Sequence, residues 1–122
     1  MFGEIYVVNR KNFDEKSVSG EIINIMRPTV LGNPFKMEKE EDREISVVKF
    51  YHYLREEYAK KDRVYSELLR ICEILKTGKD VYLVCCCAPK LCHGDIIKNA
   101  LKGMLKNAKV SVEGEPKNET HV

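Results

Sequence analysis

The sequence lacks any long apolar segment. No stretch of its 122 residues approaches the roughly 20 consecutive apolar residues that a membrane-spanning helix needs. The N-terminal segment MFGEIYVVNRKNF also lacks the basic region followed by an apolar region that is typical of a signal peptide. We therefore expect a cytoplasmic protein with no membrane partner, in a compartment where thiols stay reduced.

The sequence also lacks a large excess of charge of either sign. Its 21 Lys and Arg residues nearly balance its 19 Asp and Glu residues, and the net charge is +2. This balance argues against a protein that coats nucleic acid through its overall charge, although it is compatible with a local basic patch. Neither repeats nor low-complexity linkers are present. We expect one domain over residues 1–112 and a polar, flexible tail over residues 113–122.

The hydrophobic pattern predicts a small α/β domain. Short apolar, β-branched runs indicate four strands, at residues 4–8, 21–26, 80–86 and 108–112. Apolar residues at helical spacing indicate three helices, from about residue 42, from 62 to 76, and from 95 to 106. The last strand–helix–strand succession predicts parallel pairing through a right-handed crossover. We therefore expect a Rossmann-like, three-layer domain in which about three helices flank a short, mostly parallel sheet.

In the first predicted helix, the residues at helical spacing are expected to face the core. They are Val47, Tyr51, Leu54 and Tyr58, with Val48 beside them.

Cysteine is uncommon, with five in the chain, yet four of these fall in the segment CCCAPKLC. Three consecutive cysteines are a poor disulfide framework, because successive side chains of a strand point to opposite faces. This alternation places Cys85 and Cys87 on one face and Cys86 on the other, so we predict that Cys86 is buried in the core. Cys72 lies on the apolar face of a predicted helix and is expected to be buried as well.

The cysteine cluster lies where a predicted strand ends and the next helix begins. Ligands of open α/β sheets bind at the carboxyl ends of the strands, and a helix N-terminus, here at Gly94, attracts phosphate. The same field favours a thiolate at Cys92, with His93 or Asp95 as the partner in proton transfer. The candidate catalytic residues are therefore Cys92, His93 and Asp95.

Four interpretations of the cluster remain open. A zinc ion, if bound, would be held by Cys85, Cys87, Cys92 and His93. Structural zinc sites usually draw their ligands from two separated pairs, and the sequence offers no second pair. We therefore predict no cofactor. Cys92 can instead act as a nucleophilic or redox thiol, with Cys87 as the resolving thiol. The turn can also hold a ligand without covalent chemistry, or it can be a tight connection with buried thiols.

A second signature is the segment RPTVLGNPF, in which prolines and a Gly-Asn pair exclude regular structure. Arg27 directly follows a predicted strand and can bind a carboxylate or phosphate. The Asn33 amide can both donate and accept hydrogen bonds. Gly32 allows a positive φ or a close approach of two backbone segments. The alternative is a well-anchored surface loop.

Arg43 stands at the start of the following predicted helix, where a cation opposes the helix dipole. This placement favours a ligand-binding role, unless pairing with Glu40 or Glu44 accounts for it.

The two signatures together resemble a known family, the domain of unknown function numbered four-three-two-six, which is found in bacteria and their phages. The matching residues are Arg27, Pro28, Gly32, Asn33, Pro34 and Phe35, then Arg43, Tyr51 and Leu54, then Cys85, Cys87, Pro89, Cys92, His93, Gly94 and Asp95. The resemblance covers about residues 22–101, and it departs at Cys86, where the family often has an aromatic residue. It implies kinship rather than an activity, and we expect the loop and the turn to converge on one cleft.

We therefore expect the protein to bind or process a nucleotide-like or phosphate-bearing small molecule in this cleft. The ligand-binding residues would be Arg27, Gly32, Asn33, Arg43 and Gly94. An alternative is a non-enzymatic phage or mobile-element module that binds nucleic acid or a host protein, for which lysines at positions 98, 102, 106 and 109 would form a basic stripe. A zinc-stabilised domain is the third alternative.

Overall fold

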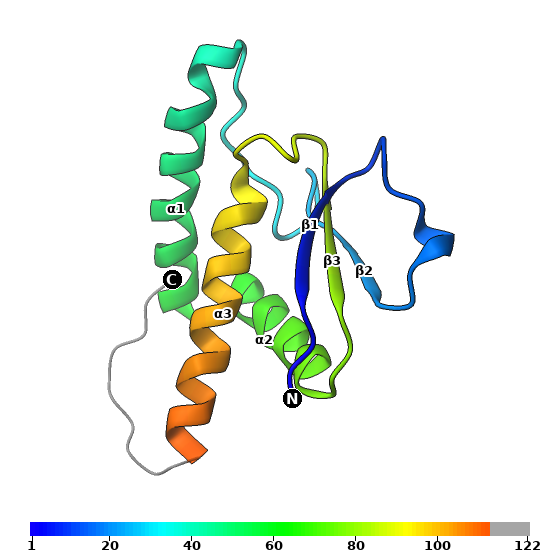
Figure 1. Ribbon diagram of the computed structural model, residues 1–122. Coiled ribbons are helices and arrows are strands. Elements are labelled where there is room, and N and C mark those ends of the chain that lie inside the picture. Colours follow the sequence, from blue (N-terminus) through cyan, green and yellow to red (C-terminus); the bar gives the residue numbers. More distant parts are fainter. Residues whose placement is uncertain (113–122) are drawn as a thin grey trace.

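The computed structural model describes residues 1–112, and the predicted tail at 113–122 lies outside the described residues. The described part belongs to the α/β class, as predicted (Figure 1). Its strands are β1 (Ile5–Asn9), β2 (Glu21–Asn24) and β3 (Val81–Cys85). Its helices are α1 (Arg43–Lys60), α2 (Arg63–Lys76) and α3 (His93–Val112), with short 3-10 helices at η1 (Glu15–Ser17) and η2 (Glu40–Asp42).

The sheet has the strand order β1-β3-β2, and both outer strands run parallel to β3. The register pairs Ile5 with Val81 and Ile23 with Leu83. The central strand VYLVC is rich in β-branched and apolar residues and is almost entirely buried, as a central parallel strand must be. Because all the strands run the same way, their carboxyl ends meet at one edge of the sheet.

The three helices pack against one another and cover one face of the sheet (Figure 1). Most of their buried side chains form a single cluster with those of the strands. On the opposite face, the ring of Phe13 stacks on Tyr82, and Tyr82 stacks on Tyr6. The described domain therefore has two layers where we expected three, because the β1–β2 connection holds only the short helix η1.

The predicted fourth strand at 108–112 is wrong, because α3 continues to Val112. No Pro or Gly interrupts the sequence between Met104 and Val112. An established helix extends through β-branched residues at a cost of only about 0.5 kcal/mol each. Parallel pairing is present nonetheless, between β3 and the two outer strands.

The core face of α1 is partly different from the predicted one. Val47 and Leu54 are buried as expected, but Phe50 is fully buried between them and Val48 is 51% exposed. Positions 47, 50 and 54 follow the spacing of three and four residues that keeps side chains on one helix face, and Val48 lies about 100° away. Within residues 1–112, none of the helices combines the length and apolar character needed to cross a membrane.

Candidate functional site

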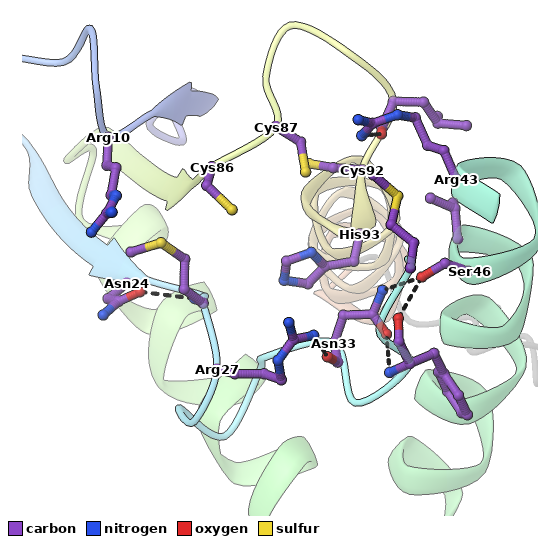
Figure 2. Close-up of a pocket in the computed structure, with 15 residues that line it drawn as sticks. Arg10, Asn24, Arg27, Asn33, Arg43, Ser46, Cys86, Cys87, Cys92 and His93 are labelled. Atoms are coloured by element: carbon purple, nitrogen blue, oxygen red, sulfur yellow. Dashed lines mark hydrogen bonds between the residues drawn. The ribbon is translucent and has the colours of Figure 1, made fainter. Parts of the chain in front are cut away.

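A cavity of about 650 Å³ lies at the carboxyl ends of the strands, within the size range of small-molecule sites. Its walls come from the ends of the strands, the loop between β2 and α1, the start of α1, and the turn between β3 and α3 (Figure 2). The charged, imidazole and thiol side chains of the lining are Arg10, Arg27, Arg43, His93, Cys86, Cys87 and Cys92.

The loop between β2 and α1 is held in shape by Asn33 and Ser46. Asn33 Oδ1 accepts a hydrogen bond from the Phe35 N–H at 2.9 Å, and Asn33 Nδ2 donates to Ser46 Oγ at 3.0 Å. The Ser46 hydroxyl donates to the Phe35 carbonyl oxygen at 2.7 Å. Asn33 lines the cavity, but its amide mainly builds the loop. Sequence reasoning missed Ser46, although a serine next to Val47, a predicted core residue of this helix, is a signal that could have found it.

Gly32 permits a close backbone approach within the same loop. A Cβ atom at this position would lie 2.9 Å from both the N and Cα atoms of Arg27. The Arg27 side chain bends across the loop and donates from Nη1 to the Asn33 carbonyl oxygen at 2.7 Å. This bond fixes the guanidinium beside the cavity, where Figure 2 shows it below the ring of His93. Gly32 itself is not part of the lining.

Arg43 connects the start of α1 with the cysteine turn. It donates from Nε and Nη2 to the two carboxylate oxygens of Glu40, at 2.6 and 3.0 Å. Its Nη1 donates to the Leu91 carbonyl oxygen at 3.0 Å. Its pKa is raised, first by the hydrogen bond to Glu40 and then by one to Cys87. Pairing with Glu40 therefore accounts for a cation at this helix start, and Glu40 also pairs with Lys90 at 3.7 Å.

Arg10 is a third arginine of the lining, which sequence reasoning missed. It directly follows β1, and its backbone N–H donates to the Cys85 carbonyl oxygen at 2.8 Å, next to the end of β3. Its side chain is exposed and forms no ion pair with any of the described residues. The signal was available, because Arg10 follows the end of β1 even more closely than Arg27 follows the end of β2.

Cys85 and Cys92 form a buried thiol pair, with their sulfur atoms 3.5 Å apart. The pKa of Cys85 is lowered to about 6, chiefly because Cys92 donates a hydrogen bond to it. The same hydrogen bond, together with burial, raises the pKa of Cys92. We expected the helix N-terminus to favour a thiolate at Cys92, but the structure favours the thiolate at Cys85.

The other cysteines occupy three different environments. Cys86 is exposed and lines the cavity, so the prediction that it is buried in the core is wrong. β3 ends at Cys85, and strand alternation no longer applies once the chain leaves the sheet. Cys87 is half-buried and also lines the cavity. Cys72 is buried as predicted, and burial raises its pKa to about 11.

His93 is 8% exposed and is held by the main chain. Its Nε2 lies 2.7 Å from the Ile25 carbonyl oxygen, which can only accept, so Nε2 carries the proton. The ring packs edge-on against Phe50, with the ring centroids 5.0 Å apart. Burial lowers the pKa of His93, and the hydrogen bond to Ile25 only partly opposes this effect. Burial of His93 beside the cavity therefore favours its neutral imidazole form.

Gly94 and Asp95 build the start of α3 and are not part of the cavity lining. The Asp95 carboxylate accepts the N–H of Cys92 at 3.0 Å, as the third helical residue does in a capping box. A Cβ atom at Gly94 would lie 2.8 Å from Val7 Cγ1, so glycine lets the helix start approach β1. Both residues orient Cys92 and His93 rather than face a ligand.

A metal site was one of the alternatives for the cysteine turn. Within the described part of the chain, no group of three or more His, Cys, Asp or Glu side chains is arranged to hold a metal ion.

The family model described as "Domain of unknown function (DUF4326)" matches residues 8–103. The chain belongs to this family. The DUF4326 match includes both the RPTVLGNPF loop and the cysteine turn, and it confirms the kinship that these motifs implied. The comparisons with curated proteins and with solved structures gave no match.

Proposed function

We propose that the cavity binds a nucleotide-like small molecule that carries a phosphate or a similar oxyanion. The observation that carries this proposal is the charge of the lining. Three arginines are present in it, and none of the lining side chains among the described residues is acidic. Arg43 is paired with Glu40, whereas Arg10 and Arg27 have no ion-pair partner in the described part. Guanidinium groups without an acidic partner are suited to bind phosphate oxygens.

The rest of the lining supports a ligand with an apolar or aromatic part. Phe35, Val47, Leu91 and two methionines form apolar walls beside the arginines. The Asn24 side chain uses Oδ1 to accept the Met26 N–H, so its Nδ2 can still donate to a polar edge. A phosphate near Arg10 and Arg27 with a ring against the apolar wall would use both features.

The catalytic roles considered for Cys92, His93 and Asp95 fit the geometry less well than binding does. His93 Nε2 is hydrogen-bonded to the main chain, and Asp95 is bonded to the Cys92 N–H. A proton relay from Asp95 to a ligand would therefore require the helix start to rearrange. Binding requires no such change, since Arg10 and Arg27 already line the cavity.

A thermal-shift panel tests the proposal. The compounds are inorganic phosphate, pyrophosphate, nucleoside monophosphates and the matching nucleosides without phosphate, all at one ionic strength, with zinc chloride and a chelator as further arms. A ligand present at 100 times its Kd stabilises the fold by about 2.7 kcal/mol, which raises the Tm of a domain this small by several degrees. We expect phosphate-bearing compounds to raise Tm and their nucleosides to have little effect.

Arginine variants identify the site. Arg10→Ala and Arg27→Ala should each weaken binding of the compound that gives the largest shift by roughly tenfold or more, because a charge-assisted hydrogen bond contributes about 1.5–3 kcal/mol. Arg63→Ala is the matched control, since Arg63 is exposed at the start of α2 and lies outside the lining. Equal shifts from nucleosides, or full affinity in both cavity variants, would contradict the proposal. A response to zinc alone would support the metal alternative, and no response to any compound would favour a macromolecular partner.

A further inference from the structure

The proposed anion site assigns no binding role to the pair formed by Cys85 and Cys92. The two side chains are 1% and 3% exposed, and their sulfur atoms lie 3.5 Å apart. Cys85 is the last residue of β3, and Cys92 immediately precedes α3. The pair therefore lies between the sheet and the helical layer, and Cys92 forms part of the cavity wall.

Backbone N–H groups surround both sulfur atoms. The N–H groups of Cys87 and Ala88 donate to Cys85 Sγ at 3.5 and 3.4 Å, and that of Gly94 donates to Cys92 Sγ at 3.3 Å. Donors aimed at sulfur stabilise negative charge on it, and a thiolate is the form of cysteine that reacts with oxidants. A pair of thiols buried only for packing would not need three such donors.

We propose that Cys85 and Cys92 are an oxidisable dithiol, which a small hydroperoxide such as hydrogen peroxide converts into a disulfide at the wall of the cavity. The sulfur atoms would have to approach by about 1.5 Å to reach the S–S bond length of about 2.05 Å. Cys92 lines the cavity and the Cys85 sulfur lies 3.5 Å from the Cys92 sulfur, so hydrogen peroxide, which is close to water in size, has to pass Cys92 to reach Cys85. The inference does not depend on anion binding.

The reaction balances in two steps. The Cys85 thiolate attacks one peroxide oxygen, so that an S–O bond forms and the O–O bond breaks. The products are a sulfenic acid on Cys85 and a hydroxide ion, which takes a proton from solvent to become water. The Cys92 sulfur then attacks the Cys85 sulfur, the S–S bond forms, and the S–O bond breaks. The departing hydroxide takes the proton of Cys92 and becomes the second water.

Thiol counting and peptide mapping on the full chain test the inference. The protein is first reduced, then kept with a chelator so that no metal occupies the thiols, and treated with hydrogen peroxide at neutral pH. We expect the number of alkylatable thiols, counted after denaturation, to fall from five to three. Mass spectrometry should find one Cys85–Cys92 disulfide, and dithiothreitol should restore all the thiols.

Two variants distinguish this pair from the exposed thiols. Cys92→Ser should stop the reaction at a sulfenic acid on Cys85, which dimedone traps, and Cys86→Ser should form the disulfide as the wild type does. The Arg27→Ala variant should also oxidise normally, so a failed anion site would not affect this result. A disulfide that includes Cys86 or Cys87, or loss of thiols only in denatured protein, would overturn the proposal. Mapping of the wild type alone decides the question if Cys92→Ser fails to fold.

Discussion

At the scale of single residues, many side chains that suggest a binding site serve the structure. Asn33 holds its own loop, Asp95 bonds the start of α3, and Arg43 is paired with Glu40. Arg10 and Arg27 are the arginines of the cavity lining that form no ion pair with the described residues. His93 combines both roles, because it lines the cavity and is bonded to Ile25.

The pKa of His93 predicts a dependence of stability on pH. Well above pH 6.5, which is about the pKa of an unperturbed histidine, His93 is neutral in both the folded and the unfolded chain. Below that pH the unfolded chain binds a proton that folded His93 resists, because burial lowers its pKa in the folded state. The free energy of unfolding should therefore fall as the pH drops from 7 to 5.5.

Urea denaturation at several pH values measures this effect. His93→Asn should show a smaller fall than the wild type, since the titrating ring is absent. His52→Asn should behave as the wild type does, because His52 is exposed on α1. The same slope in all three proteins would show that His93 does not carry the effect.

At the scale of elements, α1 has a narrow core face and a broad exposed face. Phe50 is fully buried and contacts the rings of Tyr53 and His93. Val48 lies on the same helix and is 51% exposed. The ring that packs against His93 thus belongs to a residue of another helix, Phe50, which was not among the predicted core residues.

Substitutions in α1 test this assignment of faces. Phe50→Ala should lower the free energy of unfolding by about 3–5 kcal/mol, because it leaves a cavity in the core. Val48→Ala, the matched control, should change it by less than about 0.5 kcal/mol. Chemical denaturation monitored by circular dichroism measures both values, and comparable losses in the two variants would mean that the faces are wrongly assigned.

At the scale of the whole molecule, three distant segments meet at one edge of the sheet. Arg10 follows β1, Arg27 follows β2 shortly after its end, and Cys86 follows β3. Parallel pairing brings these three positions together, although they are far apart in the sequence. A ligand bound in the cavity would therefore connect the ends of all three strands.

Hydrogen exchange tests this consequence with pyrophosphate as the probe. We expect slower amide exchange in peptides that contain Arg10, Arg27 or Cys86 when pyrophosphate is bound. Peptides that contain Gly3 or Lys79, which adjoin each other at the opposite edge, should exchange at the same rate with and without it. Protection confined to that opposite edge would contradict a site at the carboxyl ends of the strands.

The sequence by itself determined the α/β class, the family, and the three strands and three helices that the structure contains, because these depend on local hydrophobic period and on two motifs. It also indicated Arg27, Cys92 and His93 as candidate site residues, and all three line the cavity. Only the tertiary structure decided the strand order, the two layers, the pairing of Cys85 with Cys92, and the place of Arg10. These features arise from contacts between residues far apart in the chain, and a local pattern carries no information about such partners. The exposure of Cys86 was misjudged for a related reason, since the residue at which a strand leaves the sheet depends on where its neighbouring strands end.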